Sequence, residues 1–175
     1  GSLRNAIPRE AFVTVVVPEE HCADFENAVE FFEGIVAAEL SSVEPDFSFT
    51  CKETAAPDSV IDEKTQNKLI NAVYACPNGV IRMSNDMEGL VETSTNLAIV
   101  KSGNFKIEVQ CLLRSSVESA KKDLAEMMDS VFTLAGAEVK FTGAYPGWKP
   151  NPNSEILETM KAVYNDKYGR VPEIK

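Results

Sequence analysis

Arg114 is the side chain of this sequence that is best placed to bind a ligand. It closes the alternating part of the stretch Phe105–Ser116 (FKIEVQCLLRSS), in which apolar and polar residues take turns. This alternation predicts a strand with one face on a core and one face in water, and Arg114 falls on the wet face. A guanidinium at the end of a rigid strand can form two parallel hydrogen bonds with a carboxylate, which predicts an anion-binding residue. The alternative is a solvated arginine without a ligand.

The other reactive residue types form no recognisable catalytic or metal-binding pattern. His21 is the single histidine and Cys22 follows it directly, but adjacent residues on a helix do not face each other. This argues against a Cys–His nucleophile pair. A lone histidine beside one cysteine also makes no zinc site, because such a site takes three or four ligands. The remaining cysteines, Cys51, Cys76 and Cys111, are widely separated and include no CxxC pair. We therefore expect reduced thiols and a cytoplasmic protein.

The composition argues against several classes of partner. The chain has 175 residues, 44% of them hydrophobic, a formal net charge of -10 and a sequence pI of about 4.6. Nucleic acids and anionic membrane surfaces attract basic patches, so this acidity argues against both. The apolar runs are too short to span a bilayer. The length is sufficient to bury a hydrophobic core.

The hydrophobic periodicity predicts strands and helices as far as residue 142. The expected strands are 11–17, 47–52, 80–83, 90–101, 105–114 and 137–142. The expected helices are 18–40, about 62–74, and a third that follows Ser116 and ends at Gly136, with a tight hairpin at Ser102–Asn104. Ser115 and Glu118 have the spacing of a capping box at the start of the third helix.

These elements predict an α+β fold: a ferredoxin-like two-layer sandwich with a mainly antiparallel sheet and helices on one face. Residues 11–17, which are apolar on both faces, would form a central strand.

The composition changes after residue 142. Residues 143–153 hold three prolines and two glycines, which predicts a crossing between domains. A helix is expected from Ser154 to Gly169, but one amphipathic helix cannot bury a core. We therefore expect a first domain at 1–142, a crossing at 143–153, and an incomplete second domain at 154–175, so that the chain is a fragment.

Five long motifs follow one another along the chain: RNAIPREA at 4–11, PNGVIRMSNDMEGLVETSTNLA at 77–98, VQCLLRSS at 109–116, GAYPGWKPNPNSEIL at 143–157 and YGRVPEI at 168–174. Together they resemble the Xaa-His dipeptidases, also called aminoacyl-histidine or cytosolic non-specific dipeptidases. These are metallopeptidases related to carnosinase. The resemblance covers nearly the whole chain and is weakest between residues 19 and 66.

The resemblance implies a catalytic domain that holds two zinc ions and an inserted lid domain that also forms a homodimer. Residues 1–142 would be most of the lid, and 154–175 the return into the catalytic domain. The family's zinc ligands and catalytic glutamate match no position in this chain. The intact parent would hydrolyse dipeptides, whereas we expect the 175 residues alone to bind no catalytic zinc and to be inactive.

The resemblance also implies two substrate-binding residues. In the family, the asparagine of the N-A-I-P loop and the arginine of the R-S-S strand end help to hold the C-terminal carboxylate of the substrate. Here they correspond to Asn5 and Arg114. Asn5 has an alternative interpretation, because asparagine before a strand often only forms a turn. The alternative function for the whole chain is a non-catalytic α+β module for self-association or regulatory binding.

Overall fold

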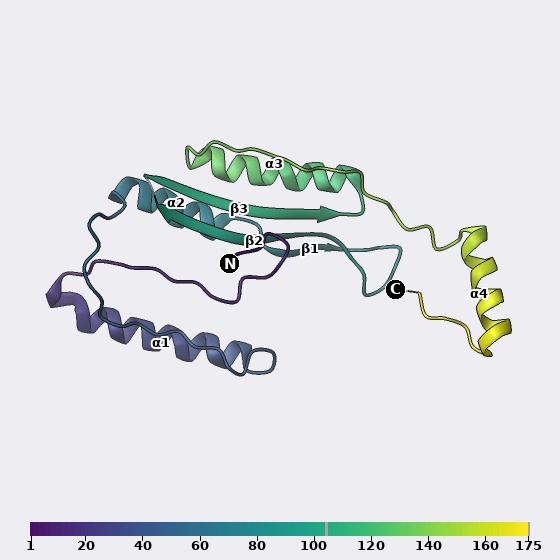
Figure 1. Ribbon diagram of the computed structural model, residues 1–175, viewed down its shortest axis with the longest axis horizontal. Helices are drawn as coiled ribbons and strands as arrows, with labels where there is room; N and C mark the ends of the chain where they lie inside the picture. Colours follow the sequence, from purple (N-terminus) through teal and green to yellow (C-terminus); the bar gives the residue numbers. More distant parts are fainter. Residues whose placement is uncertain (104, 175) are drawn as a thin grey trace. The chain divides into compact units, whose positions relative to one another are not determined.

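The computed structural model describes residues 1–103 and 105–174, with helices and strands in the order shown in Figure 1. The chain divides into two compact units. Residues 1–11 and 63–175 form the larger unit, and residues 12–62 form the smaller one. The domain crossing at 143–153 stays a prediction.

An antiparallel three-stranded sheet forms the centre of the larger unit. Its strands are β1 (Gly79–Met83), β2 (Val91–Gly103) and β3 (Lys106–Ser115), with β2 in the middle. The pairing of β2 with β3 runs from Thr93 opposite Ser115 to Gly103 opposite Lys106. This confirms the hairpin expected from the alternation. Asn104, the last residue of the predicted hairpin turn, lies outside the described residues.

Helix α3 (Glu118–Leu134) packs on β3 and contributes one face to the core of this unit. Its buried residues are Ala120, Leu124 and Met128. They lie four residues apart and therefore share one face of the helix. Helix α2 (Glu63–Ala75) contacts α3, and the thiol of Cys76, just after α2, lies 3.8 Å from the sulfur of Met128. The sheet, α2 and α3 therefore share one core.

The predicted α+β class and mainly antiparallel sheet are confirmed, and the predicted helices are present. The final helix, α4 (Glu155–Tyr168), begins and ends where the sequence predicts. The Ser154 side chain accepts a hydrogen bond from the Leu157 N–H at 3.3 Å, which caps the first turn. Gly169 ends the helix with a φ of 66°, a conformation that glycine adopts without strain.

Three predicted strands are wrong: residues 11–17, 47–52 and 137–142 adopt no regular secondary structure. In the first of them, Phe12 is 91% exposed and Val16 is 62% exposed. β-Branched residues favour a strand only where a neighbouring strand supplies hydrogen bonds and a surface to pack on. In the described part of the chain, the sheet consists of β1, β2 and β3 alone, so these segments have no ladder partner.

The smaller unit is built on α1 (Cys22–Leu40), which follows a turn of 3-10 helix at Glu19–His21. Val29 is the buried residue of α1. The segment after the helix is attached to it where the Phe49 N–H donates a hydrogen bond to a Glu33 carboxylate oxygen at 3.2 Å. No helix among the described residues is both long and apolar enough to cross a membrane.

Leu124→Ala should destabilise the larger unit by about 2–5 kcal/mol, because Leu124 is 0% exposed and its truncation leaves a cavity between α3 and β3. Leu134→Ala on the same helix is the matched control, since Leu134 is 88% exposed. Urea unfolding followed by circular dichroism measures both variants. Similar losses for the two variants would contradict the described core.

Candidate functional site

Arg114 is exposed one residue before the end of β3. Because side chains alternate along a strand, it projects from the face opposite to that of Leu113 and Ser115. No hydrogen bond or ion pair joins its guanidinium to another of the residues that the structure describes. The exposed position expected from the sequence is therefore confirmed, and the five donors of the guanidinium are free for a ligand.

Asn5 is exposed in a turn near the start of the chain. The Ala6 N–H donates a hydrogen bond to the Leu3 carbonyl at 3.4 Å, so Arg4 and Asn5 are the two central residues of a β-turn. The structure thus agrees with the interpretation of Asn5 as a turn former. This does not conflict with ligand binding, because a turn exposes the side chain at its centre.

Asn96 of β2 attaches this turn to the sheet. Its side-chain nitrogen, Nδ2, donates hydrogen bonds to the two backbone carbonyl groups on either side of Asn5, at 3.0 Å to Arg4 and 2.6 Å to Ala6. No sequence pattern marks Asn96 as a functional residue, although it lies in the motif at 77–98. The available signal was its residue type, because asparagine is depleted in strands and its presence in a central strand requires a reason.

The register of the sheet brings the Asn5 turn to the face that carries Arg114. Ser94 of β2 lies directly opposite Arg114 of β3, so their side chains project from the same face. Asn96 comes two residues after Ser94 and therefore also projects from that face. The turn that holds Asn5 is thus attached to the face of the sheet from which Arg114 projects, through a β2 residue two positions from the one opposite Arg114.

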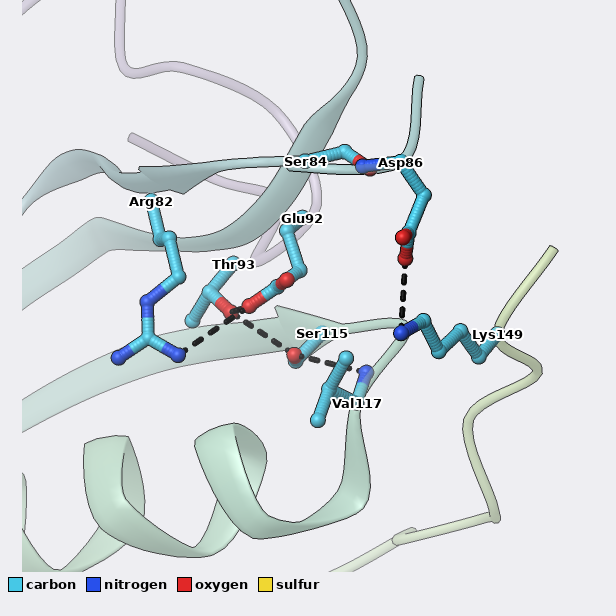
Figure 2. A network of polar contacts seen from close by, with 8 residues as sticks. All are labelled: Arg82, Ser84, Asp86, Glu92, Thr93, Ser115, Val117 and Lys149. Carbon is cyan, nitrogen blue, oxygen red and sulfur yellow. Dashed lines mark hydrogen bonds and ion pairs between the residues drawn. The ribbon is translucent and has the colours of Figure 1, made fainter.

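A chain of polar contacts fixes the end of β3 (Figure 2). The hydroxyl oxygens of Thr93 and Ser115 lie 2.8 Å apart, and that of Thr93 lies 3.3 Å from a carboxylate oxygen of Glu92. Because the single hydroxyl proton of Thr93 goes to the carboxylate, Ser115 donates to Thr93. The Val117 N–H donates to Ser115 at 3.1 Å, and Arg82 donates to Glu92 at 3.4 Å. The three strands are therefore connected where β3 ends.

The predicted capping box at the start of α3 is not formed. The Ser115 hydroxyl accepts from the Val117 N–H instead, and Val117 is the residue that precedes the helix. The Glu118 carboxylate accepts hydrogen bonds from Lys121 at 2.8 Å and from the Gly147 N–H at 3.3 Å. These contacts, the lysine first, lower the pKa of Glu118. Of the two residues predicted to form the capping box, Ser115 thus bonds to β2 and Glu118 bonds to the 143–153 segment.

An ion pair attaches the 143–153 segment to the loop between β1 and β2. Lys149 Nζ lies 2.7 Å from a carboxylate oxygen of Asp86 (Figure 2). The Ser84 hydroxyl orders this loop, since it accepts from the N–H groups of Asp86 and Met87, both at 3.2 Å. The hydrogen bond and charge of Asp86 raise the pKa of Lys149. The segment is thereby held at the same end of the sheet as Arg114.

Metal binding and thiol catalysis find little support in these residues. No group of three or more His, Cys, Asp or Glu within 1–103 and 105–174 could hold a metal ion. The residues of this part of the chain therefore do not fit the zinc ions implied by the resemblance. His21 lies 3.9 Å from the Asp24 carboxylate, while the Cys22 thiol contacts the Pro18 carbonyl at 3.6 Å.

Cys76 is buried and Cys111 is half-buried in the larger unit, and both thiols are free of disulfides. The contact with Cys76, together with burial, raises the pKa of Cys111. A protonated thiol is a poor nucleophile. Cys111 is therefore poorly suited to thiol catalysis.

Over its whole length, the chain is similar to one segment of bacterial dipeptidases. The cytosol non-specific dipeptidase of Escherichia coli (strain K12) is 35% identical over 175 residues, which are 100% of this chain and 36% of that protein. The crystal structure of aminoacylhistidine dipeptidase from Vibrio alginolyticus matches with a TM-score of 0.96 at 42% identity, again over 100% and 36% of the two chains. No family model matches. The resemblance expected from the five motifs is thus confirmed, and the chain spans just over a third of each relative.

Comparing Thr93→Val with Thr95→Val should distinguish the stability contributed by the polar network from the effect of replacing a buried hydroxyl that lies outside this network. Both threonines are buried in β2, at 2% and 4% exposure, but the Thr95 hydroxyl has no hydrogen-bond partner among the described residues. Thr93→Val should cost about 1–3 kcal/mol, because Ser115 and Glu92 lose a partner. Thr95→Val should be neutral or stabilising. Equal losses in urea unfolding would contradict the network.

Proposed function

We propose that this chain is the part of a dipeptidase that recognises the C-terminal carboxylate of the substrate. One observation carries the proposal: β2 brings the turn that holds Asn5 to the same face of the sheet as the unpaired guanidinium of Arg114. The similarity to two dipeptidases over the full chain supports the substrate class.

The chemistry of Arg114 fits a preference for short peptides. A guanidinium pairs with a carboxylate through two parallel hydrogen bonds, and it carries its charge at all physiological pH values. A dipeptide places its carboxylate one residue beyond the bond to be broken, whereas a longer peptide has a neutral amide there. Arg114 would therefore favour dipeptides through charge, and Asn5 would add a neutral hydrogen-bonding group from the turn.

The remaining features of the proposal concern a longer protein of this class. There the two zinc ions and the catalytic glutamate would lie outside the residues described here, so the 175-residue chain alone would hydrolyse no dipeptide. This chain would act as the lid and contribute contacts to a homodimer. The E. coli relative is named as a cytosol enzyme, which supports a cytosolic location for this protein as well.

Arg114→Ala in the full-length enzyme should lower kcat/KM for a free dipeptide by a factor that corresponds to about 2–5 kcal/mol, the range for truncating one partner of a desolvated charge pair. The C-terminal amide of the same dipeptide should lose much less, because it offers no charge. Steady-state kinetics with both substrates measure the difference.

Lys106→Ala is the matched control for charge. Lys106 lies on the same face of β3, roughly 26 Å away along the strand, and its exposed pair with Glu108 should contribute little. Arg114→Lys should recover only part of the loss, because an ammonium cannot form the two-pronged pair. Equal losses for the free dipeptide and the amide in Arg114→Ala would refute carboxylate recognition by this residue.

A further inference from the structure

We propose that Asn96 is a positioning residue, which holds the Asn5 turn on the sheet in the geometry that substrate binding requires. The inference rests on the proposed substrate role of Asn5 and Arg114. It assigns no direct substrate contact to Asn96, which acts through the backbone on either side of Asn5.

The geometry makes Asn96 the hydrogen-bonded attachment of the turn. Its amide group uses both N–H donors on two carbonyl groups, at 3.0 and 2.6 Å. Among the described residues, no other hydrogen bond attaches residues 3–9 to the sheet. All of these residues are exposed, so packing contributes little to their position. On a strand that lacked this amide, the turn would lose its hydrogen bonds to the sheet.

The residue type at this position is selective. An aspartate has the same shape but no N–H donors, so it would place its charge against two carbonyl oxygens. Serine and threonine donate one hydrogen bond, and glutamine carries an extra methylene that displaces its amide. Asparagine thus fits both carbonyl groups at once, which explains its presence in a central strand that otherwise favours β-branched residues.

Fixing the turn prepares the binding face before the substrate arrives. Asn96 and the Ser94–Arg114 pair project from the same face, two residues apart along β2. A turn held in place loses little conformational freedom when a ligand binds, and this saving appears in affinity. We call the two hydrogen bonds from Asn96 to the turn the clamp. Loss of the clamp should raise KM and leave kcat nearly unchanged, since the reacting groups lie elsewhere.

The test uses the full-length enzyme with Asn96→Ala and Asn96→Asp. Both should raise KM for a free dipeptide about tenfold with kcat within about twofold, the size expected from two hydrogen bonds between neutral groups. Amide hydrogen exchange of Ala6, whose N–H closes the turn on the Leu3 carbonyl, should become faster in both variants. Asn96→Ala should add nothing in an Asn5→Ala background, because the clamp acts through Asn5.

Asn78→Ala is the matched control. Asn78 also makes a hydrogen bond from its side chain to the backbone of β2, where Oδ1 accepts from the Leu97 N–H at 2.8 Å, but it does not touch the turn. It should change neither KM nor the exchange of the Ala6 amide. Unchanged exchange in Asn96→Ala would overturn the clamp. Faster exchange with an unchanged KM would overturn the positioning role.

The result for Arg114→Ala tests the proposed function independently of the result for Asn96→Ala. If Arg114→Ala fails to distinguish the free dipeptide from its amide, the proposed carboxylate recognition by Arg114 is refuted. A tenfold rise in KM for Asn96→Ala that vanishes in the Asn5→Ala background would still support Asn96 as the residue that positions Asn5. Failure of carboxylate recognition by Arg114 and failure of positioning by Asn96 therefore give different kinetic results.

Discussion

The register of β2 against β3 is the constraint on which the rest of the larger unit depends. It places Thr93 beside Ser115 on one face and Ser94 beside Arg114 on the other. A slip of one residue would exchange the two faces, because side chains alternate with a period of two. The polar network, the packing of α3 and the exposure of the guanidinium would then be lost together. The part-buried hydroxyl pair of Thr93 and Ser115 acts against such a slip, since its partners would separate.

Local pattern was sufficient for the elements whose partners are near in the sequence. The alternation between residues 105 and 116 predicted both the strand β3 and the exposed side of Arg114, and its hairpin partner β2 follows from a short turn. Helices are equally local, since their hydrogen bonds join residues four apart. The spacing of apolar residues therefore located α1, α2 and α3, and Ser154 and Gly169 marked the ends of α4.

Pattern failed where the stabilising partner is distant or belongs to another element. Residues 11–17 have strong strand propensity, yet a strand exists only with a neighbour, which the sequence of the segment cannot specify. The capping box failed for a related reason. The spacing of Ser115 and Glu118 was correct, but tertiary partners occupy both side chains: the first interacts with β2, and the second with Lys121 and Gly147.

The candidate site illustrates the same limit at the level of single residues. Motifs pointed to Asn5 and Arg114 separately, but only the tertiary structure shows that Asn96 attaches the Asn5 turn to the sheet that carries Arg114. The two are held by different means. Arg114 belongs to a strand whose end is fixed by a hydrogen-bonded chain through Ser115, whereas Asn5 depends on one amide group. A site built in this way has a rigid charge and a turn of adjustable position. In the proposed function, substrate affinity therefore depends on residue 96, which acts only through the backbone around Asn5.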